Sequence, residues 1–192
     1  MANMPNMLAY TIRGSFYPNL PPRLLVGQGA TKVRIEPTQP ADDSYWFAFL
    51  DRNNPKTLVK DFVIPGNNNT NVPAGVDAYM SNPLYIFVVA TQFLSLLHIP
   101  QGDFFDYLMK YGAGRELQRI EQLNSSLGCG SLGRPNYILT GQCGPRGGGN
   151  YPPPAYEVGS VSKTKYITMS LMPMPNGQPP YAICDSFTFV TR

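Results

Sequence analysis

The sequence predicts an α+β domain, with a mixed β-sheet or a β-sandwich-like arrangement of about eight or nine strands and two or three central helices. Two observations predict it. Segments toward both ends of the chain alternate apolar and polar residues, which is the two-residue period of a half-buried strand. Between them, residues 103–127 repeat apolar residues at helical spacing. Strands that flank a helical block are typical of helices packed on a sheet.

The length and composition fit one domain with a packed core. The chain has 192 residues, of which 43% are apolar. Charged residues make up only 14%, against about 25% in an average soluble domain, whereas Gly (18) and Pro (20) are frequent. We expect a single domain over residues 1–192, with a core at 8–143, a Gly/Pro-rich loop at 144–156 and a C-terminal β-hairpin at 157–192.

Charge and hydropathy exclude two classes of partner. The net charge is +3, and the 15 basic and 12 acidic residues form no basic block, so no nucleic-acid partner is expected. The apolar runs are far shorter than the ~20 residues of a spanning helix, so no membrane insertion is expected. Residues 1–7 lack the basic and apolar regions of a secretory signal. The sequence leaves three alternatives for the localisation: a cytoplasmic protein, part of an assembled particle released without a secretory signal, or a mature form cut from a precursor.

The first strands are expected near the N-terminus. Residues 8–16 alternate apolar and polar side chains, as a half-buried strand does. The proline-rich segment 17–22 ends this strand, because proline lacks the N–H that a strand ladder needs. Residues 31–36 alternate again and predict a second strand.

The clearest hairpin comes next. Residues 45–50 are rich in aromatic side chains and predict a buried strand, and residues 57–64 return as its partner. Asp and Asn between them, at 51–55, favour a turn because they tolerate left-handed backbone. Residues 84–90 are continuously apolar, which is typical of a strand covered on both faces. A further strand is expected at 136–140.

Two or three helices are expected in the middle of the chain. Residues 74–80 predict a short one. Residues 104–109 have apolar side chains at helical spacing, with Asp103 as the N-cap and Gly112 as the stop. Residues 115–127 predict the longest helix because they carry one apolar stripe. This stripe consists of Leu117, Ile120, Leu123 and Leu127.

The Gly/Pro-rich loop is the predicted contact element. Residues 144–156 cannot form a helix or a central strand, so we expect them to be extended, exposed and bound to a partner. After them, residues 166–171 and 181–190 predict a hairpin around a turn at Asn176 and Gly177. The candidate partner-binding residues lie on irregular, proline-rich backbone: Tyr17, Arg146, Tyr151, Pro152, Pro153, Pro154, Tyr156 and Tyr181.

No coherent catalytic or cofactor site is visible in the sequence. Residues 128–133 match G-x-G-x-x-G, but this motif ends a helix and leads to a strand, the reverse of a dinucleotide-binding loop. The glycines at 144–149 lack the Lys-Ser/Thr of a phosphate loop. His98, the single histidine, lies in an apolar stretch and is expected to be a core or boundary residue. We therefore expect no enzyme, no cofactor and no metal.

The remaining reactive groups have structural interpretations. Cys129, Cys143 and Cys184 are expected to be reduced and mostly buried, with one disulfide plus a free thiol as the alternative. Asp42 and Asp43 are expected in a solvated loop.

Part of the chain resembles the interleukin-like EMT inducer domain family. The hairpin sequence at 45–51 and 58–62, the helix at 76–80 with the strand at 86–91, and the Leu-Gly that ends the helix at 116–128 carry the resemblance. Arg134 and the aromatic strand that runs into Gly-Gln-Cys-Gly at 141–144 continue it, so that it covers roughly residues 44–157. The stretch 93–111 is longer than the family pattern, and the family's cysteine framework is absent. The resemblance implies a compact, β-sandwich-like, non-enzymatic domain that binds protein or glycan.

Three functions are compatible with these features. The first hypothesis is a structural or interaction subunit of a larger assembly, such as a virion-like particle, filament or appendage, because charge is low and Tyr, Pro, Gly and Asn are abundant. The second is a glycan- or protein-ligand-binding module of interleukin-like EMT inducer type. The third is a hydrolase-like enzyme that uses His98 with Asp103. The expected partners are proteins, including copies of the same chain, and glycans.

Overall fold

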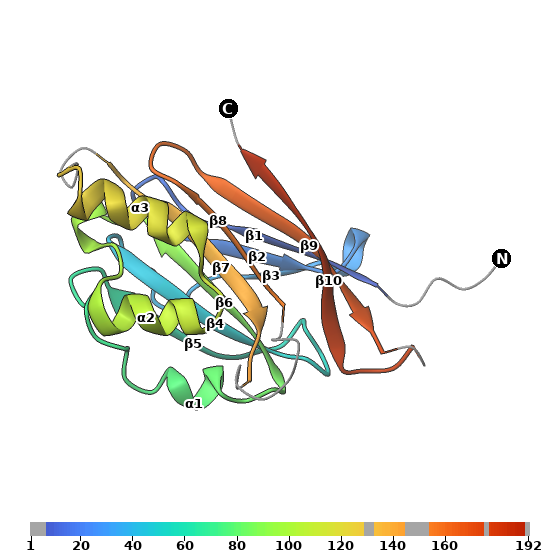
Figure 1. Ribbon diagram of the computed structural model, residues 1–192. Coiled ribbons are helices and arrows are strands. Elements are labelled where there is room, and N and C mark those ends of the chain that lie inside the picture. Colours follow the sequence, from blue (N-terminus) through green and yellow to red (C-terminus); the bar gives the residue numbers. More distant parts are fainter. Residues whose placement is uncertain (1–6, 129–132, 145–153, 175–176, 191–192) are drawn as a thin grey trace.

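Two five-stranded antiparallel sheets and three α-helices make up the structure, so the domain is α+β and mostly β (Figure 1). The computed structural model describes residues 7–128, 133–144, 154–174 and 177–190, the last six of these by their backbone alone. In spatial order, the outer sheet contains β10 (Tyr181–Val190), β9 (Lys165–Pro173), β1 (Leu8–Arg13), β2 (Arg23–Val26) and β3 (Val33–Ile35). In the same way, the central sheet contains β5 (Leu58–Pro65), β4 (Ser44–Asp51), β6 (Tyr85–Gln92), β7 (Asn136–Gln142) and β8 (Ala155–Ser160).

The three middle strands of the central sheet, β4, β6 and β7, are buried on both faces, which explains the long apolar runs of their sequences. Along β4, Trp46, Ala48 and Leu50 pack against the outer sheet, whereas Tyr45 and Phe47 pack toward the helices. A strand whose two faces are both covered reads as a nearly continuous apolar segment. The buried strand predicted at 84–90 is confirmed as β6, in which every residue after Tyr85 is buried.

The outer sheet covers the central sheet with one face only. Its strands alternate buried and partly exposed residues, and the buried set packs into the core shared by the two sheets. The alternation predicted at 8–16 is therefore confirmed for β1, which ends at Arg13. The inward-facing residues of its middle strands are Tyr10, Ile12, Leu24, Val26, Ile167, Met169 and Leu171.

Two strands were not expected from the sequence. β2 has only four residues and follows a proline-rich segment that hides it. β8 lies where the sequence predicts the end of the exposed loop and the start of the C-terminal hairpin, and it pairs with β7 in the central sheet. The predicted hairpin itself is formed by β9 and β10. Within the described residues, the strands of both sheets pair antiparallel, so neither sheet is mixed; an isolated bridge between Ser15 and Gln92 is parallel.

The helices α1 (Asp77–Met80), α2 (Gly102–Lys110) and α3 (Arg115–Ser125) lie on the other side of the central sheet (Figure 1). Two short 3₁₀ helices, η1 (Gly29–Thr31) and η2 (Leu96–His98), lie in the connections. None of the helices among the described residues is long and apolar enough to cross a membrane.

Two details of the predicted helices are wrong. Asp103 is not the N-cap of α2, because the helix begins at Gly102 and Asp103 lies within its first turn. The apolar stripe of α3 buries Leu117 and Ile120, but Leu127 lies beyond the helix end and is 67% exposed. Gly112 has the positive φ of 98° expected of a helix stop.

The two sheets are joined at opposite ends of β6. At one end, the Ser15 N–H donates to the Thr91 carbonyl at 3.0 Å. At the other end, the N–H of Arg52, the residue after β4, donates to the carbonyl of Leu84, the residue before β6. Arg52 also forms hydrogen bonds with Tyr181, the first residue of β10. We call these the Ser15 end and the Tyr181 end. The eight residues of β6 separate them by about 25 Å.

Candidate functional site

A groove of about 410 Å³ lies at the Tyr181 end, between the start of β1, the β4–β5 turn and the start of β10. Its lining combines one aromatic ring with amide, hydroxyl, ammonium and apolar groups. The lining residues are Met7, Leu8, Gln28, Thr31, Asn53, Asn54, Pro55, Lys56, Pro179 and Tyr181. Such a mixture can accept and donate hydrogen bonds around one flat apolar surface, which suits a polar ligand or an interface.

Arg52 and Tyr181 fix one wall of the groove. The Tyr181 N–H donates to the Arg52 carbonyl at 2.8 Å, and Arg52 Nε donates back to the Tyr181 carbonyl at 2.9 Å. A second guanidinium nitrogen of Arg52 donates to the Pro83 carbonyl at 2.8 Å. Partial burial lowers the pKa of Arg52. One side chain thus ties β10, the β4–β5 turn and the entry to β6 together.

The β4–β5 turn supplies the amide groups of the groove, as the sequence predicted for a turn rich in Asp and Asn. The Asn53 N–H donates to an Asp51 carboxylate oxygen at 2.8 Å, and the Asn54 N–H donates to the Asp51 carbonyl at 3.1 Å. Both asparagines are exposed. Because their backbone is held by Asp51, their side chains are presented on a fixed turn. The turn was predictable from its residues, but no sequence signal indicates that it lines a groove with Tyr181.

Of the predicted contact residues, the structure brings two to this end of the molecule. Tyr181 is half-buried and lines the groove, and Pro154 is exposed, immediately before the strand that begins opposite Gly141. Gly144, predicted as the exposed start of the loop, is buried, and its N–H donates to the Met80 carbonyl at 2.9 Å. Arg146, Tyr151, Pro152 and Pro153 lie outside the described residues.

The other two predicted contact residues lie elsewhere. Tyr17 is 58% exposed but follows β1 at the Ser15 end, the length of β6 away from the groove. Tyr156 does not lie in the exposed loop where the sequence predicted it: it lies within β8, pairs with Thr140 and packs partly buried against the core between the sheets. The tyrosine is therefore part of the central sheet, because the strand begins earlier than the proline run suggested.

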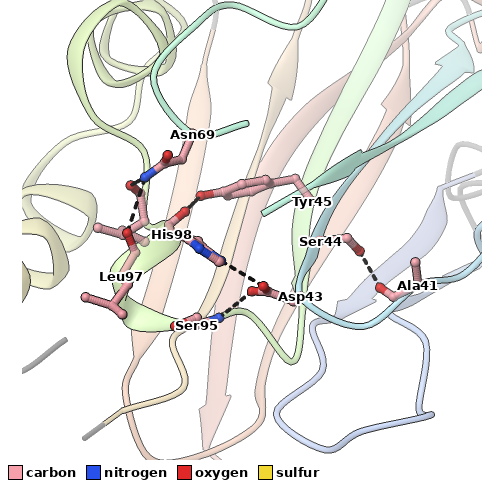
Figure 2. A network of polar contacts seen from close by, with 9 residues as sticks. Ala41, Asp43, Ser44, Tyr45, Asn69, Ser95, Leu97 and His98 are labelled. Carbon is pink, nitrogen blue, oxygen red and sulfur yellow. Dashed lines mark hydrogen bonds and ion pairs between the residues drawn. The ribbon is translucent and has the colours of Figure 1, made fainter. Parts of the chain in front are cut away.

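His98 lies in a second polar cluster, shown in Figure 2. Its Nδ1 is 2.7 Å from a carboxylate oxygen of Asp43, and the other oxygen of that carboxylate accepts the Ser95 N–H at 2.7 Å. The His98 carbonyl accepts the Tyr45 hydroxyl, and the Asn69 amide donates to the Ile99 carbonyl at 2.9 Å. The cluster joins the start of β4 to η2 and to the loop after β5.

One prediction about this cluster is wrong. Asp103, the expected partner of His98, lies in the first turn of α2, whereas Asp43 makes the contact. Asp42 and Asp43 lie in a loop as expected, with Asp42 exposed and the Asp43 side chain 38% exposed. Asp43 is nevertheless held in place, since it has a positive φ of 54° and its carbonyl accepts the Gly66 N–H at 2.6 Å. A carboxylate on Nδ1 orients an imidazole as in a general base, and the His98 side chain is 31% exposed. Within the described residues, Asp43 is the polar partner of this ring.

The thiols and the metal-ligating side chains form no further centre among the described residues. Cys143 is a free, buried thiol, as expected, and burial raises its pKa; Cys184 is also free but is exposed, which was not expected. Cys129 lies outside the described residues, as does most of the G-x-G-x-x-G motif. No three His, Cys, Asp or Glu side chains in the described ranges gather around a position for a metal ion.

Comparisons with known proteins do not place the chain in a family. No protein-family model matches the chain. No curated protein matches its sequence.

Proposed function

We propose that the protein is a non-catalytic interaction subunit that joins a larger protein assembly through its Tyr181 end. The observation that carries this proposal is the groove at that end, whose wall is held by the reciprocal hydrogen bonds of Arg52 and Tyr181. A fixed binding surface loses little conformational entropy on association, so its contacts translate more fully into affinity. Tyrosine enrichment and few charges are also typical of the buried part of interfaces.

The strand that starts in the groove supports association with further copies of the chain. β10 is the edge of the outer sheet and, within the described residues, pairs with β9 on one side. Its ten-residue sequence contains a single charged residue, Asp185. A long edge strand with so few charges favours pairing with a strand of another molecule. We therefore take a second copy of this chain as the first partner to test.

Light scattering across a protein concentration series tests the proposal. We expect the wild-type mass to rise above the 21.2 kDa of one chain. Asn53→Arg, which puts a bulky charge at the groove mouth on an exposed turn, is expected to remain monomeric. Asn71→Arg is the matched control, because Asn71 is also exposed but is not a lining residue of the groove. A wild-type protein that stays monomeric throughout the series would contradict self-assembly.

The alternative is a glycan-binding module, which the resemblance to the interleukin-like EMT inducer family also implies. The chemistry of the groove favours it, because tyrosine rings stack on sugar faces and asparagine amides both donate to and accept from hydroxyl groups. A glycan array tests it: binding that Asn53→Arg removes and Asn71→Arg keeps would support this function. An array without signal above background would leave the assembly subunit as the proposal.

A hydrolase-like function rests on the hydrogen bond between His98 and Asp43. It would need a hydrolysable substrate placed at the free side of the imidazole. His98→Gln, with the wild type as reference, tests it on any hydrolytic activity that the purified protein displays. Activity that survives this substitution unchanged would exclude His98 as a catalytic base.

A further inference from the structure

The exposed face of the outer sheet carries a cluster of three arginines. Arg13 on β1 lies directly opposite Arg23 on β2, and Arg34 lies on the next strand, β3. All three residues alternate with buried neighbours, so they face away from the core. The helices lie beyond the central sheet and leave this face uncovered by any helix of the described residues (Figure 1).

Two like charges directly opposite each other on neighbouring strands are destabilising, so this pair needs a compensating partner. The acidic residue at the cluster is Glu36, and its carboxylate already accepts from the Arg34 guanidinium. Within the described part of the chain, the guanidinium of Arg23 forms no hydrogen bond or ion pair. Arg13 donates from one terminal nitrogen to the Pro21 carbonyl at 2.7 Å, while its Nε is buried without a partner.

We propose that Arg13 and Arg23 together bind a tetrahedral oxyanion with two negative charges, either a phosphate or a sulfate group. Planar guanidinium groups bind such oxyanions through pairs of parallel hydrogen bonds. Tyr166, which lies opposite Arg13 on β9, places a phenol next to the site. The pKa of Arg13 is lowered, mainly by burial and next by the positive charge of Arg23. This inference is independent of the proposed function at the Tyr181 end.

Thermal unfolding, followed by the fluorescence of the buried Trp46, tests the site with sodium phosphate, sodium sulfate and sodium succinate at constant ionic strength adjusted with chloride. A ligand that binds only the folded protein raises its melting temperature. We expect phosphate or sulfate to raise the wild-type melting temperature by a few degrees above the chloride reference, with the larger shift identifying the preferred anion. A larger shift with succinate than with both tetrahedral anions would overturn the assignment.

Two substitutions locate the binding. Arg23→Gln removes one guanidinium and also relieves its repulsion with Arg13, so we expect a folded protein whose affinity for the anion falls about tenfold or more. Arg115→Gln is the matched control, because it removes the same charge at an exposed position in the helical layer. Arg23→Lys keeps the charge without the planar fork and is expected to retain only part of the shift. Equal anion responses of Arg23→Gln and Arg115→Gln, or no wild-type response, would overturn the proposal.

Discussion

Arg52 and Tyr181 bond to each other in both directions: the Tyr181 N–H donates to the Arg52 carbonyl at 2.8 Å, and Arg52 Nε donates to the Tyr181 carbonyl at 2.9 Å. The two residues are 129 positions apart in the sequence. They connect the central sheet to the edge strand of the outer sheet and fix the wall of the groove. The proposed contact surface therefore depends on one arginine that is not itself a lining residue.

Replacing Arg52 by Met is expected to destabilise the protein. Met keeps most of the apolar stem but removes the donors to the carbonyls of Tyr181 and Pro83, which we expect to lower the free energy of unfolding by about 1–3 kcal/mol. Urea unfolding followed by Trp46 fluorescence measures the loss. Arg115→Met, at an exposed helix position, is expected to stay within about 0.5 kcal/mol of the wild type. Equal stability of the two variants would show that the hydrogen bonds of Arg52 do not stabilise the Tyr181 end.

The stability of the protein is expected to fall at alkaline pH. Tyr10, Tyr45 and Tyr137 are fully buried, and burial raises the pKa of each phenol above its ordinary value near 10. The three phenols contribute fully to the free energy of unfolding below about pH 10, and this contribution is lost as pH rises further. The reason is that the unfolded chain then releases protons that the folded chain retains.

Tyr10→Phe tests this linkage at one position. The Tyr10 hydroxyl is hydrogen-bonded to Thr140 at 3.0 Å, so its removal is expected to cost about 1 kcal/mol at neutral pH. Above pH 10, the variant is expected to lose stability less steeply than the wild type, since one fewer phenol ionises on unfolding. Urea unfolding between about pH 8 and pH 11 measures both slopes. Identical slopes would contradict the burial of a protonated Tyr10.

Asp43 is expected to tolerate Asn better than Ala. Its backbone has a positive φ, which Asn adopts more readily than Ala, and an Asn side-chain oxygen can still accept the Ser95 N–H. We expect Asp43→Ala to lower the free energy of unfolding by about 1–3 kcal/mol and Asp43→Asn to lower it by less. Thermal or urea unfolding compares the two. An alanine variant as stable as the asparagine variant would show that the cluster in Figure 2 holds no part of the fold.

Local patterns in the sequence predicted the elements of this fold better than its architecture. The period-two alternation at β1, the Asp- and Asn-rich turn after β4 and the fully apolar β6 each carry a local physical signal, and each is confirmed. β2 and β8 were missed because short strands beside prolines have no such signal. Alternation shows that one face of a strand is buried, but it does not show which sheet covers that face. The two-sheet arrangement could therefore not be predicted without knowing which strands pair.

The candidate sites were harder to predict because they are made by distant residues. His98 and Asp43 are 55 positions apart, and the sequence assigned His98 the nearer Asp103 instead. Tyr181 was predicted as a contact residue from its proline neighbours, but Arg52, which holds it, carries no local signal of that role. Tyr156 has the same kind of neighbours and lies in a strand. A tyrosine next to proline is therefore a weak indicator of an exposed contact.

The loop between β7 and β8 is expected to be dispensable for folding. The Gln142 N–H donates to the Pro154 carbonyl at 3.3 Å, so the two strands meet next to the loop and a shorter connection can close it. Deleting residues 147–153 is expected to leave the melting temperature within a few degrees while abolishing assembly. Calorimetry and light scattering measure the two effects. An unfolded deletion variant would show that the segment is part of the core.

The proposed function requires that the protein associates through its Tyr181 end. Hydrogen–deuterium exchange of the full chain at low and high protein concentration tests it most directly, because amides buried by association exchange more slowly. We predict slower exchange at high concentration in peptides that cover residues 52–56 and 179–190, and unchanged exchange at 17–22 near the Ser15 end and at 67–72. Protection confined to the Ser15 end, or no concentration dependence at residues 52–56 and 179–190, would show that the protein does not associate through its Tyr181 end.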